Sequence, residues 1–223
     1  MILNALGEVI LDVRKYMDTN KHTQKYNQFM IDIETTGVKP DLNHIIEIAI
    51  VPFGMTNNVM FISPLEYHML FKLNHNQGYR DYDAQTLIWW DKQSKEIRES
   101  VFSHFFDDSL NNPKTLLELT KFITYLSRAD TQFWSKPNSF DFMFLQSLFS
   151  DFKIIFPFNY WIAKDMAGFC SGLSFVHQKT LDYRVYKPLK REGAHSSMDD
   201  CYYQLEWLEN AISNNSTEEP LPF

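Results

Sequence analysis

The segment from Phe29 to Gly37, FMIDIETTG, constrains the fold and the chemistry of this chain more than any other part of the sequence. Apolar and polar residues alternate along it with the period of two that is typical of a β-strand with one buried face. Asp32 and Glu34 then lie together on the face opposite the apolar residues, with Cα atoms about 7 Å apart. The segment predicts a strand that carries a pair of carboxylates.

Two carboxylates on one face of a strand repel each other unless something offsets their charge. Burial and the neighbouring negative charge would raise the pKa of at least one of them until it took up a proton. Mg²⁺ and Mn²⁺ prefer oxygen ligands and would let both carboxylates stay ionised. The pair therefore indicates a metal site, and the alternative is an exposed strand end whose two acids are solvated.

Changes in the spacing of apolar residues along the chain predict an α/β fold. Strand-like runs at residues 45–53 and 67–73 follow the first strand after short polar connections, which favour antiparallel neighbours. The later elements that we expect are helices near 83–99, 113–126, 140–149 and 198–212, and short strands at 132–135 and 159–163. This order predicts a mixed sheet, with three antiparallel strands and then parallel strands, flanked by helices.

The sequence divides into three parts. Residues 1–27 carry apolar side chains at near-helical spacing, from Ile2 to Val13, and predict an N-terminal helical extension. Residues 28–213 contain no internal repeat and no Pro/Gly/Ser-rich linker, so we expect a single domain there. Residues 214–223 form a tail.

Composition excludes several classes of protein. With 44% hydrophobic and 16% aromatic residues the chain can bury a sizeable core, which excludes a disordered protein. No run of about 18 apolar residues occurs, and the N-terminus lacks the pattern of a signal peptide, so we expect no contact with a membrane. Cys170 and Cys201 are too few for a disulfide framework, and we expect two buried thiols in a reducing, cytoplasmic setting.

The charge balance by itself argues against a nucleic-acid partner. The chain has 21 Lys and Arg against 28 Asp and Glu, a net charge of −7. A surface that holds nucleic acid by charge alone would normally shift this balance toward positive values.

Asp141 is a second candidate for the chemistry. It is the only charged residue between Lys136 and Asp151, in a stretch that is apolar on nearly every side. Carboxylates are almost never fully buried without a partner. One interpretation is a metal ligand; the other is an acid in the first helical turn, favoured by the helix dipole and preceded by a cap at Asn138 or Ser139.

A third cluster lies where the last helix is expected to begin. If Ser196 is the N-cap, Asp199 occupies the third helical position, as in a capping box. Asp200 is then beside the buried stripe of the helix, where it can turn toward a site. His195 precedes the helix in a loop, either as a surface residue or as a group that transfers protons.

Taken in order along the chain, these residues resemble the sequence pattern of the DEDDh exonucleases, which have a ribonuclease-H-like fold. The resemblance runs from about Gln28 to Ile212. Several segments are also similar to the exonucleases of T-even bacteriophages, namely Asn138–Asp141, Trp89 and Trp90 with Lys92–Ser94, Pro157–Trp161 followed by Lys164 and Asp165, and His195–Cys201. At Lys164-Asp165-Met166 the chain departs from the pattern, and we expect a structural role for Asp165.

The resemblance implies a metal-dependent active site. Asp32, Glu34, Asp141 and Asp200 would hold two Mg²⁺ or Mn²⁺ ions, with Asp32 bridging them, and His195 would be the general base. Phosphodiester hydrolysis requires an activated water and a stabilised leaving oxygen, and two ions about 4 Å apart supply both. The charges of the four carboxylates and the two divalent ions would nearly cancel. The negative net charge of the chain therefore argues only against tight binding of nucleic acid without metal.

The resemblance also implies a substrate and a polarity of cleavage. Single-stranded DNA would be degraded from its 3′ end to 5′-mononucleotides, in the host cytoplasm if a phage encodes the chain. The expected substrate-binding residues are Thr35, Thr36, Gly37, Phe140, Lys187 and Arg191, with Trp89 and Trp90 either stacking on bases or packing in the core. The alternatives are an RNA-trimming enzyme and an inactive nucleic-acid-binding module on the same fold. The sequence does not determine the oligomeric state.

Overall fold

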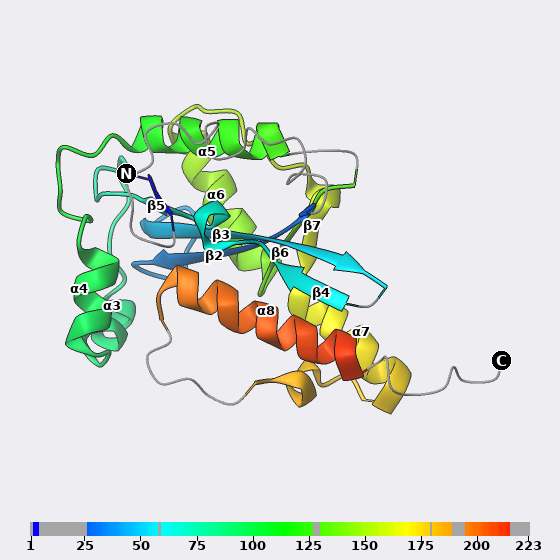
Figure 1. Cartoon of the computed structure of the whole chain (residues 1–223). Coiled ribbons are helices and arrows are strands. Elements are labelled where there is room, and N and C mark those ends of the chain that lie inside the picture. Colours follow the sequence, from blue (N-terminus) through cyan, green and yellow to red (C-terminus); the bar gives the residue numbers. More distant parts are fainter. Residues whose placement is uncertain are drawn as a thin grey trace.

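A twisted mixed sheet forms the centre of the protein (Figure 1). The computed structural model describes residues 2–4, 26–57, 59–126, 130–178, 180–188 and 195–214. The strand order is β1-β5-β3-β2-β6-β7, and β4 pairs with β3. The strands are β1 (Ile2–Asn4), β2 (Gln28–Thr35), β3 (Ile45–Thr56), β4 (Val59–Ile62), β5 (Met69–Lys72), β6 (Gln132–Ser135) and β7 (Ala163–Asp165).

The expected mixture of strand directions is confirmed. Strands β2, β3 and β5 are successive antiparallel neighbours, whereas β6 is parallel to β2 and β7 is parallel to β6. The antiparallel register places Asp32 opposite Ala49 and Glu34 opposite Glu47. Strand β2 thus lies at the junction of the antiparallel and parallel parts of the sheet.

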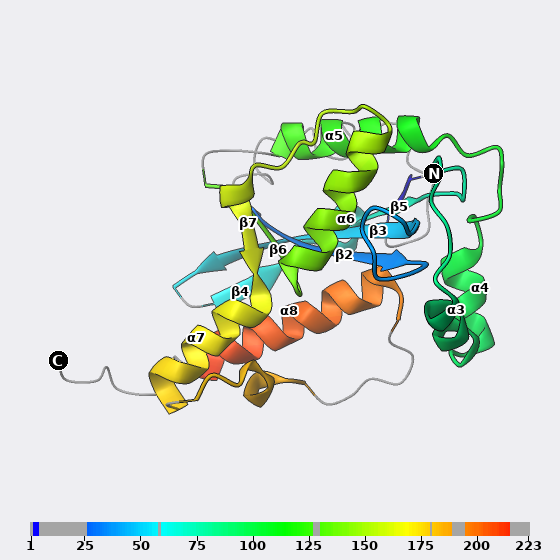
Figure 2. The same ribbon diagram turned by 180° about the vertical axis from the view of Figure 1, so that it is seen from behind.

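Helices cover both faces of the sheet (Figures 1 and 2). Helices α5 and α6 lie over one face and α7 and α8 over the other, while α3 and α4 lie beside the sheet. Their bounds are α3 (Ala84–Asp91), α4 (Lys95–Phe102), α5 (Asn112–Leu126), α6 (Asn138–Asp151), α7 (Met166–Gln178) and α8 (Ser197–Asn214). Short 3-10 helices occupy Leu65–Tyr67, Tyr160–Ile162 and Tyr183–Tyr186.

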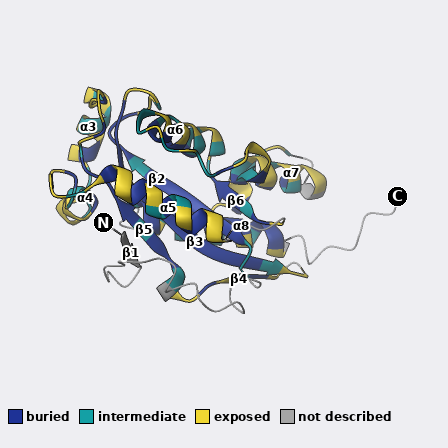
Figure 3. Ribbon diagram, turned by 90° about the horizontal axis from the view of Figure 1, so that it is seen from above, coloured by how far each residue is buried: buried dark blue, intermediate teal, exposed yellow. Residues whose placement is uncertain are grey.

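The alternation of β2 divides the core into two layers, and the central strands are buried on both sides (Figure 3). Phe29 and Ile31 pack with residues of α5 and α6, whereas Met30 packs with Cys201 and Leu205 of α8. The face of β2 that carries the two acids is therefore covered by α8, and Glu34 near its end is half-buried.

Several local expectations require correction. Ile2–Asn4 form a strand that pairs with β5, so the predicted N-terminal helix is wrong at these residues, and residues 5–25 lie outside the described part of the chain. Residues 159–163 do not form a strand: a 3-10 turn covers Tyr160–Ile162, and β7 begins only at Ala163. Sequence reasoning also missed β4 and α7, both of which are short or irregular in their apolar spacing.

The expectation of two buried thiols is confirmed. Cys170 and Cys201 are free and buried. None of the helices in the described part of the chain combines the length and the hydropathy that a membrane span requires.

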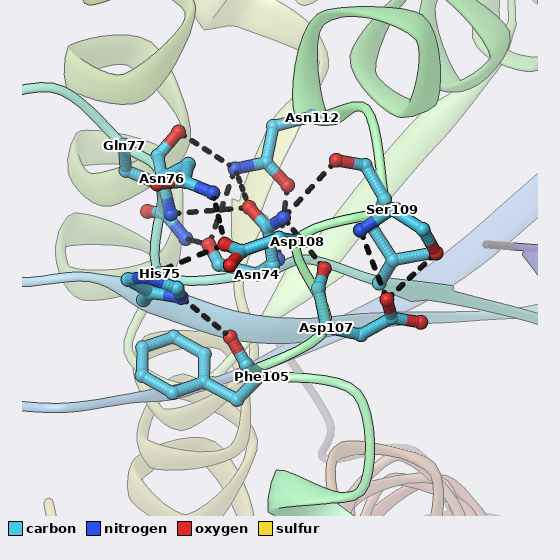
Figure 4. A network of polar contacts seen from close by, with 10 residues as sticks. Asn74, His75, Asn76, Gln77, Phe105, Asp107, Asp108, Ser109 and Asn112 are labelled. Carbon is cyan, nitrogen blue, oxygen red and sulfur yellow. Dashed lines mark hydrogen bonds and ion pairs between the residues drawn. The ribbon is translucent and has the colours of Figure 1, made fainter.

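An amide-rich loop after β5 fixes the path of the chain toward α3 (Figure 4). The Asn112 side chain, at the start of α5, donates to the backbone and side chain of Asn74 and accepts from the Asn74 N–H. Gln77 hydrogen-bonds both the N–H and the carbonyl of Ile45, at the start of β3. The loop is thus tied to α5 and to the sheet, and this anchoring places α3 near the end of β2.

Candidate metal and nucleic-acid site

The end of β2 and the start of α8 bring three carboxylates together. Asp32 and Glu34 come from alternate positions of β2, and Asp200 comes from the first turn of α8. One carboxylate oxygen from each residue lies within 4.8 Å of the corresponding oxygens of the other two. Such a cluster of oxygen ligands suits a hard divalent cation.

Asp141 approaches the same cluster from α6. Its side chain is only 2% exposed, and its Oδ2 has no hydrogen-bond partner among the described residues. A buried carboxylate oxygen without a partner is costly unless a cation or a proton satisfies it. The unpartnered oxygen therefore fits a metal ligand better than the alternative of a simple first-turn acid.

The four carboxyls disfavour one another's ionisation. Burial raises the pKa of Asp32 well above its ordinary range, and the charges of Asp141, Asp200 and Glu34 raise it further. Burial also raises the pKa of Glu34 and of Asp200, and it raises the pKa of Asp141 to about 7. Divalent cations would reverse this effect, because opposite charge stabilises the ionised carboxylates.

A buried ion pair that the sequence analysis missed anchors the start of α8. Glu47 on β3, 1% exposed, forms an ion pair with its cross-strand neighbour Lys72. The Glu47 carboxylate also accepts hydrogen bonds of 2.8 Å from both the N–H and the hydroxyl of Ser197. The sequence signal for this pair was that Glu47 is the only acid in the apolar run of residues 45–53. The pair fixes the helix end that carries Asp200.

Gln204, one turn beyond Asp200 on α8, forms a hydrogen bond with Asp32. Its Nε2 donates to Asp32 Oδ1 at 2.6 Å, and the residue is only 4% exposed. The bond orients the Asp32 carboxylate and partly offsets the rise of its pKa. Its spacing of four residues from Asp200 was the only sequence signal for this role.

Asp199 and Asp165 act as helix caps and do not join the cluster. The Ser196 hydroxyl accepts from the Asp199 N–H and donates to its carboxylate, as the capping interpretation predicts. Asp165 accepts from the N–H of Gly168 at 2.6 Å and from that of Asn138 at 2.9 Å. It therefore caps both α7 and α6, which agrees with the expected structural role. The predicted caps of α6 are wrong, because Pro137 occupies the N-cap and forms no side-chain cap.

His195 lies between the carboxylates and an aromatic wall. Its backbone has a φ of 124°, which few residues other than glycine adopt, and its ring packs edge-to-face on Trp89 with 4.9 Å between centroids. It lies close enough to Asp200 to lower the pKa of that carboxyl, against the larger effect of burial. His195 is thus beside the predicted metal site, although it is not part of the three-carboxylate cluster.

A cleft of about 400 Å³ opens beside Glu34. It is lined by Thr35 and Gly37, at and just after the end of β2, by Trp89 and Trp90 of α3, and by Phe140 of α6. Trp89 is 39% exposed, whereas Trp90 is buried and donates its indole N–H to the Thr35 carbonyl. Trp90 therefore fixes the wall, and Trp89 and Phe140 present aromatic surface to the cleft.

Two residues of the predicted substrate-binding set have structural roles. Thr36 is fully buried, and its hydroxyl accepts from the His44 N–H and donates to the Asp81 carbonyl, so its side chain does not line the cleft. Gly37 does line it, but a Cβ there would come within 2.1 Å of the Asn43 side chain. The glycine is required by that close approach. Lys187 is exposed, and Arg191 lies outside the described residues.

Comparison with known proteins assigns the family. Residues 27–212 match the family described as the 3′–5′ exoribonuclease Rv2179c-like domain. The chain belongs to this family. The DEDDh-type 3′–5′ exonuclease predicted from the sequence is thereby confirmed at the level of family and enzyme class.

Individual relatives agree with the family. Over 207 residues this family member is 25% identical to an exodeoxyribonuclease of Enterobacteria phage T4, covering 82% of this chain and 88% of that protein. The zinc-bound complex of E. coli exonuclease I with single-stranded DNA superposes with a TM-score of 0.63 at 13% identity. A complex of exonuclease I with a dA13 oligonucleotide gives a TM-score of 0.58 at 13% identity.

The structural likeness confirms the fold and covers part of the larger enzyme. The first of these superpositions includes 87% of this chain but only 42% of the exonuclease I chain. It supports the ribonuclease-H-like mixed sheet with flanking helices.

Proposed function

We propose that this family member is a metal-dependent 3′–5′ exonuclease that hydrolyses single-stranded DNA to 5′-mononucleotides. The observation that carries the proposal is the convergence of three carboxylates within 4.8 Å. Asp141, whose Oδ2 has no partner among the described residues, is close enough to raise the pKa of Asp32. The aromatic cleft beside Glu34 offers a place for a terminal nucleotide.

The carboxylates fit two divalent cations. Asp32, Glu34, Asp141 and Asp200 would hold Mg²⁺ or Mn²⁺ through their carboxylate oxygens. Bound ions would supply charge stabilisation for the phosphodiester and lower the pKa of water. Gln204 keeps Asp32 in a single orientation, which reduces the reorganisation needed on loading.

The protein's own residues then orient the strand and move the proton. Trp89 and Phe140 would contact the terminal base or sugar, and the backbone of Thr35 and Gly37 would approach the same nucleotide. His195 would accept the proton of the attacking water on a ring nitrogen. The contact between His195 and Trp89 couples the position of the imidazole ring to the wall of the cleft.

DNA is the proposed substrate because the phage relative, which covers most of both chains, is an exodeoxyribonuclease. RNA trimming is the second candidate, favoured by the exoribonuclease description of the family. Both use the same carboxylates, so the sugar preference is a separate question from the chemistry.

Labelled oligonucleotides test the proposal. DNA and RNA strands of one sequence, labelled at the 3′ or the 5′ end, are incubated with Mg²⁺, with Mn²⁺ or with EDTA. We expect mononucleotides from the 3′ end, faster from DNA, and no product in EDTA. Release that continues in EDTA or starts at the 5′ end contradicts the proposal, and faster degradation of RNA selects the second candidate.

A further inference from the structure

Two lysines with no part in the carboxylate cluster lie over one indole ring next to it. Lys136, directly after β6, has its Nζ 5.0 Å from the centre of the Trp207 ring, and Lys187 has its Nζ 5.9 Å from the same point. The two ammonium groups reach this ring from separate parts of the chain. Trp207 belongs to α8, as Asp200 does.

The indole is a rigid support. Trp207 is only 2% exposed, its N–H donates to the Tyr183 carbonyl at 3.1 Å, and its ring stacks on that of Tyr183. A cation–π contact holds an ammonium group without using its N–H donors. Among the described residues, neither lysine forms an ion pair with a carboxylate. Both charges are therefore positioned and still available to an anion.

The position of the two lysines relative to the carboxylate cluster indicates which anion they would bind. Asp200 and Trp207 are seven residues apart on α8, or about 10 Å along the helix axis and nearly on the same side of it. Lys136 is also close enough to lower the pKa of Asp141 and of Asp200, against the larger effect of burial. Lys136 thus adjoins the carboxylate cluster, and Lys187 lies over the same indole ring, about two turns of α8 from Asp200.

We propose that Lys136 and Lys187, supported by Trp207, bind a backbone phosphate of the nucleic-acid strand one or two linkages from the bond that is cut. The inference rests on the proposed function and specifies how the strand is held. A compact ammonium group suits a phosphate oxygen. In a chain with a net charge of −7, local cations of this kind favour the binding of a negatively charged strand. Backbone contacts carry no base information, so this contact would serve any sequence.

Binding measurements separate this contact from catalysis. The affinity of the protein for a fluorescent oligothymidylate is measured by anisotropy in Ca²⁺ over a series of salt concentrations. The variants are Lys136→Met, Lys187→Met and, as a matched control, Lys121→Met, which removes a lysine from α5 on the other face of the sheet. We expect each of the first two to weaken binding about fivefold or more and to reduce the slope of log Kd against log salt by about 0.7. The control should leave both quantities unchanged.

Neutral linkages locate the phosphate. In a set of oligonucleotides, one linkage at a time is replaced by an uncharged methylphosphonate. When one particular linkage near the 3′ end is neutral, Lys136→Met should no longer weaken binding. When any other linkage is neutral, Lys136→Met should weaken binding as it does for the unmodified oligonucleotide. Wild-type affinity and salt slope in both variants, or a penalty that is equal for all oligonucleotides, overturns the proposal.

Two further measurements keep the outcomes distinct. Calorimetric titration with Mn²⁺ in the absence of DNA should give the same Mn²⁺ affinity for Lys136→Met as for the wild type. Weaker Mn²⁺ binding together with unchanged DNA binding would show that Lys136 acts on the carboxylates and not on a phosphate. Failure of the wild type to degrade DNA or RNA contradicts the proposed function, whereas normal degradation with unchanged binding by the variants contradicts the phosphate contact alone.

Discussion

Helices α6 and α8 each supply one carboxylate from the same helical position, but they are fixed by different means. Asp141 is the fourth residue of α6, and Asp200 is the fourth residue of α8. The start of α8 is capped by its own neighbour Ser196 and is reinforced by Glu47. The start of α6 has no side-chain cap from its own segment and depends on Asp165, 27 positions away from Asn138.

The two acids also differ in burial. Asp141 is 2% exposed and has an oxygen without a partner, whereas Asp200 is half-buried and has His195 nearby. The comparison shows that the site joins one helix start that has a cap from its own neighbour with one whose cap comes from a distant part of the chain. Four predictions test this difference.

Removing the charge of either acid should have the largest effect, and the same effect on activity. Asp141→Asn and Asp200→Asn should each reduce the rate of nucleotide release by at least about 1,000-fold, since losing a ligand should cost more than the 10–100-fold typical of groups behind ligands. Rates on a 3′ single-stranded end measure this. Asp199→Asn is the control, because Asp199 only caps α8 and should retain nearly full activity. An active Asp141→Asn variant would remove α6 from the site.

The histidine on the α8 side has no counterpart on the α6 side. His195→Ala should slow the chemical step by about 100-fold or more, the usual range for a lost general base. Because His195 is outside the carboxylate cluster, Mn²⁺ affinity measured by calorimetry should not change. Single-turnover rates and this titration together test the assignment. Unchanged rates would make His195 a surface residue, and lost Mn²⁺ binding would make it a ligand.

Stability without metal should distinguish the two acids. The pKa of Asp141 is about 7 in the folded protein and 3.8 in its ordinary state, so the folded protein binds a proton there that the unfolded chain does not. The stability from this proton is complete below about pH 4 and is lost as the pH rises through 7. Asp141→Asn should therefore stabilise the EDTA-treated protein above pH 7 by on the order of 2 kcal/mol.

Asp200→Asn should stabilise it less, because Asp200 is less buried. Urea denaturation in EDTA on both sides of pH 7 measures these differences. Equal gains for the two variants would contradict the contrast in burial.

The caps should give the smallest effects. Asp165→Ala removes an acceptor from the starts of both α6 and α7 and should lower the free energy of unfolding by about 2 kcal/mol, whereas Ser196→Ala removes one cap and should cost about 1 kcal/mol. Urea denaturation with metal present compares them. Asp165→Asn, which keeps one acceptor oxygen, should lie between Asp165→Ala and the wild type. A larger loss for Ser196→Ala would reverse the comparison.

The site was predictable where its signals are local. The alternation around Asp32 and Glu34 identified β2, and the spacing of Ser196 and Asp199 identified the cap that leaves Asp200 free. Residues that act across the sheet gave little signal. Glu47, Gln204 and Lys136 reach the site only because β3, α8 and β6 are packed around β2. The sequence also gave no signal for the buried hydroxyl of Thr36, because its hydrogen-bond partners lie 8 and 45 positions away.

The sequence by itself determined the mixed α/β pattern, the acidic strand and the order of the carboxylates along the chain. These depend on side-chain periodicity and on capping, which operate within a few residues. Only the tertiary structure decided that α8 covers the acidic face of β2, that Asp165 supports α6, and that Lys136 and Lys187 meet over Trp207. Those contacts join segments far apart in the chain, and they form only when burial of the two core layers brings the sheet and its helices together.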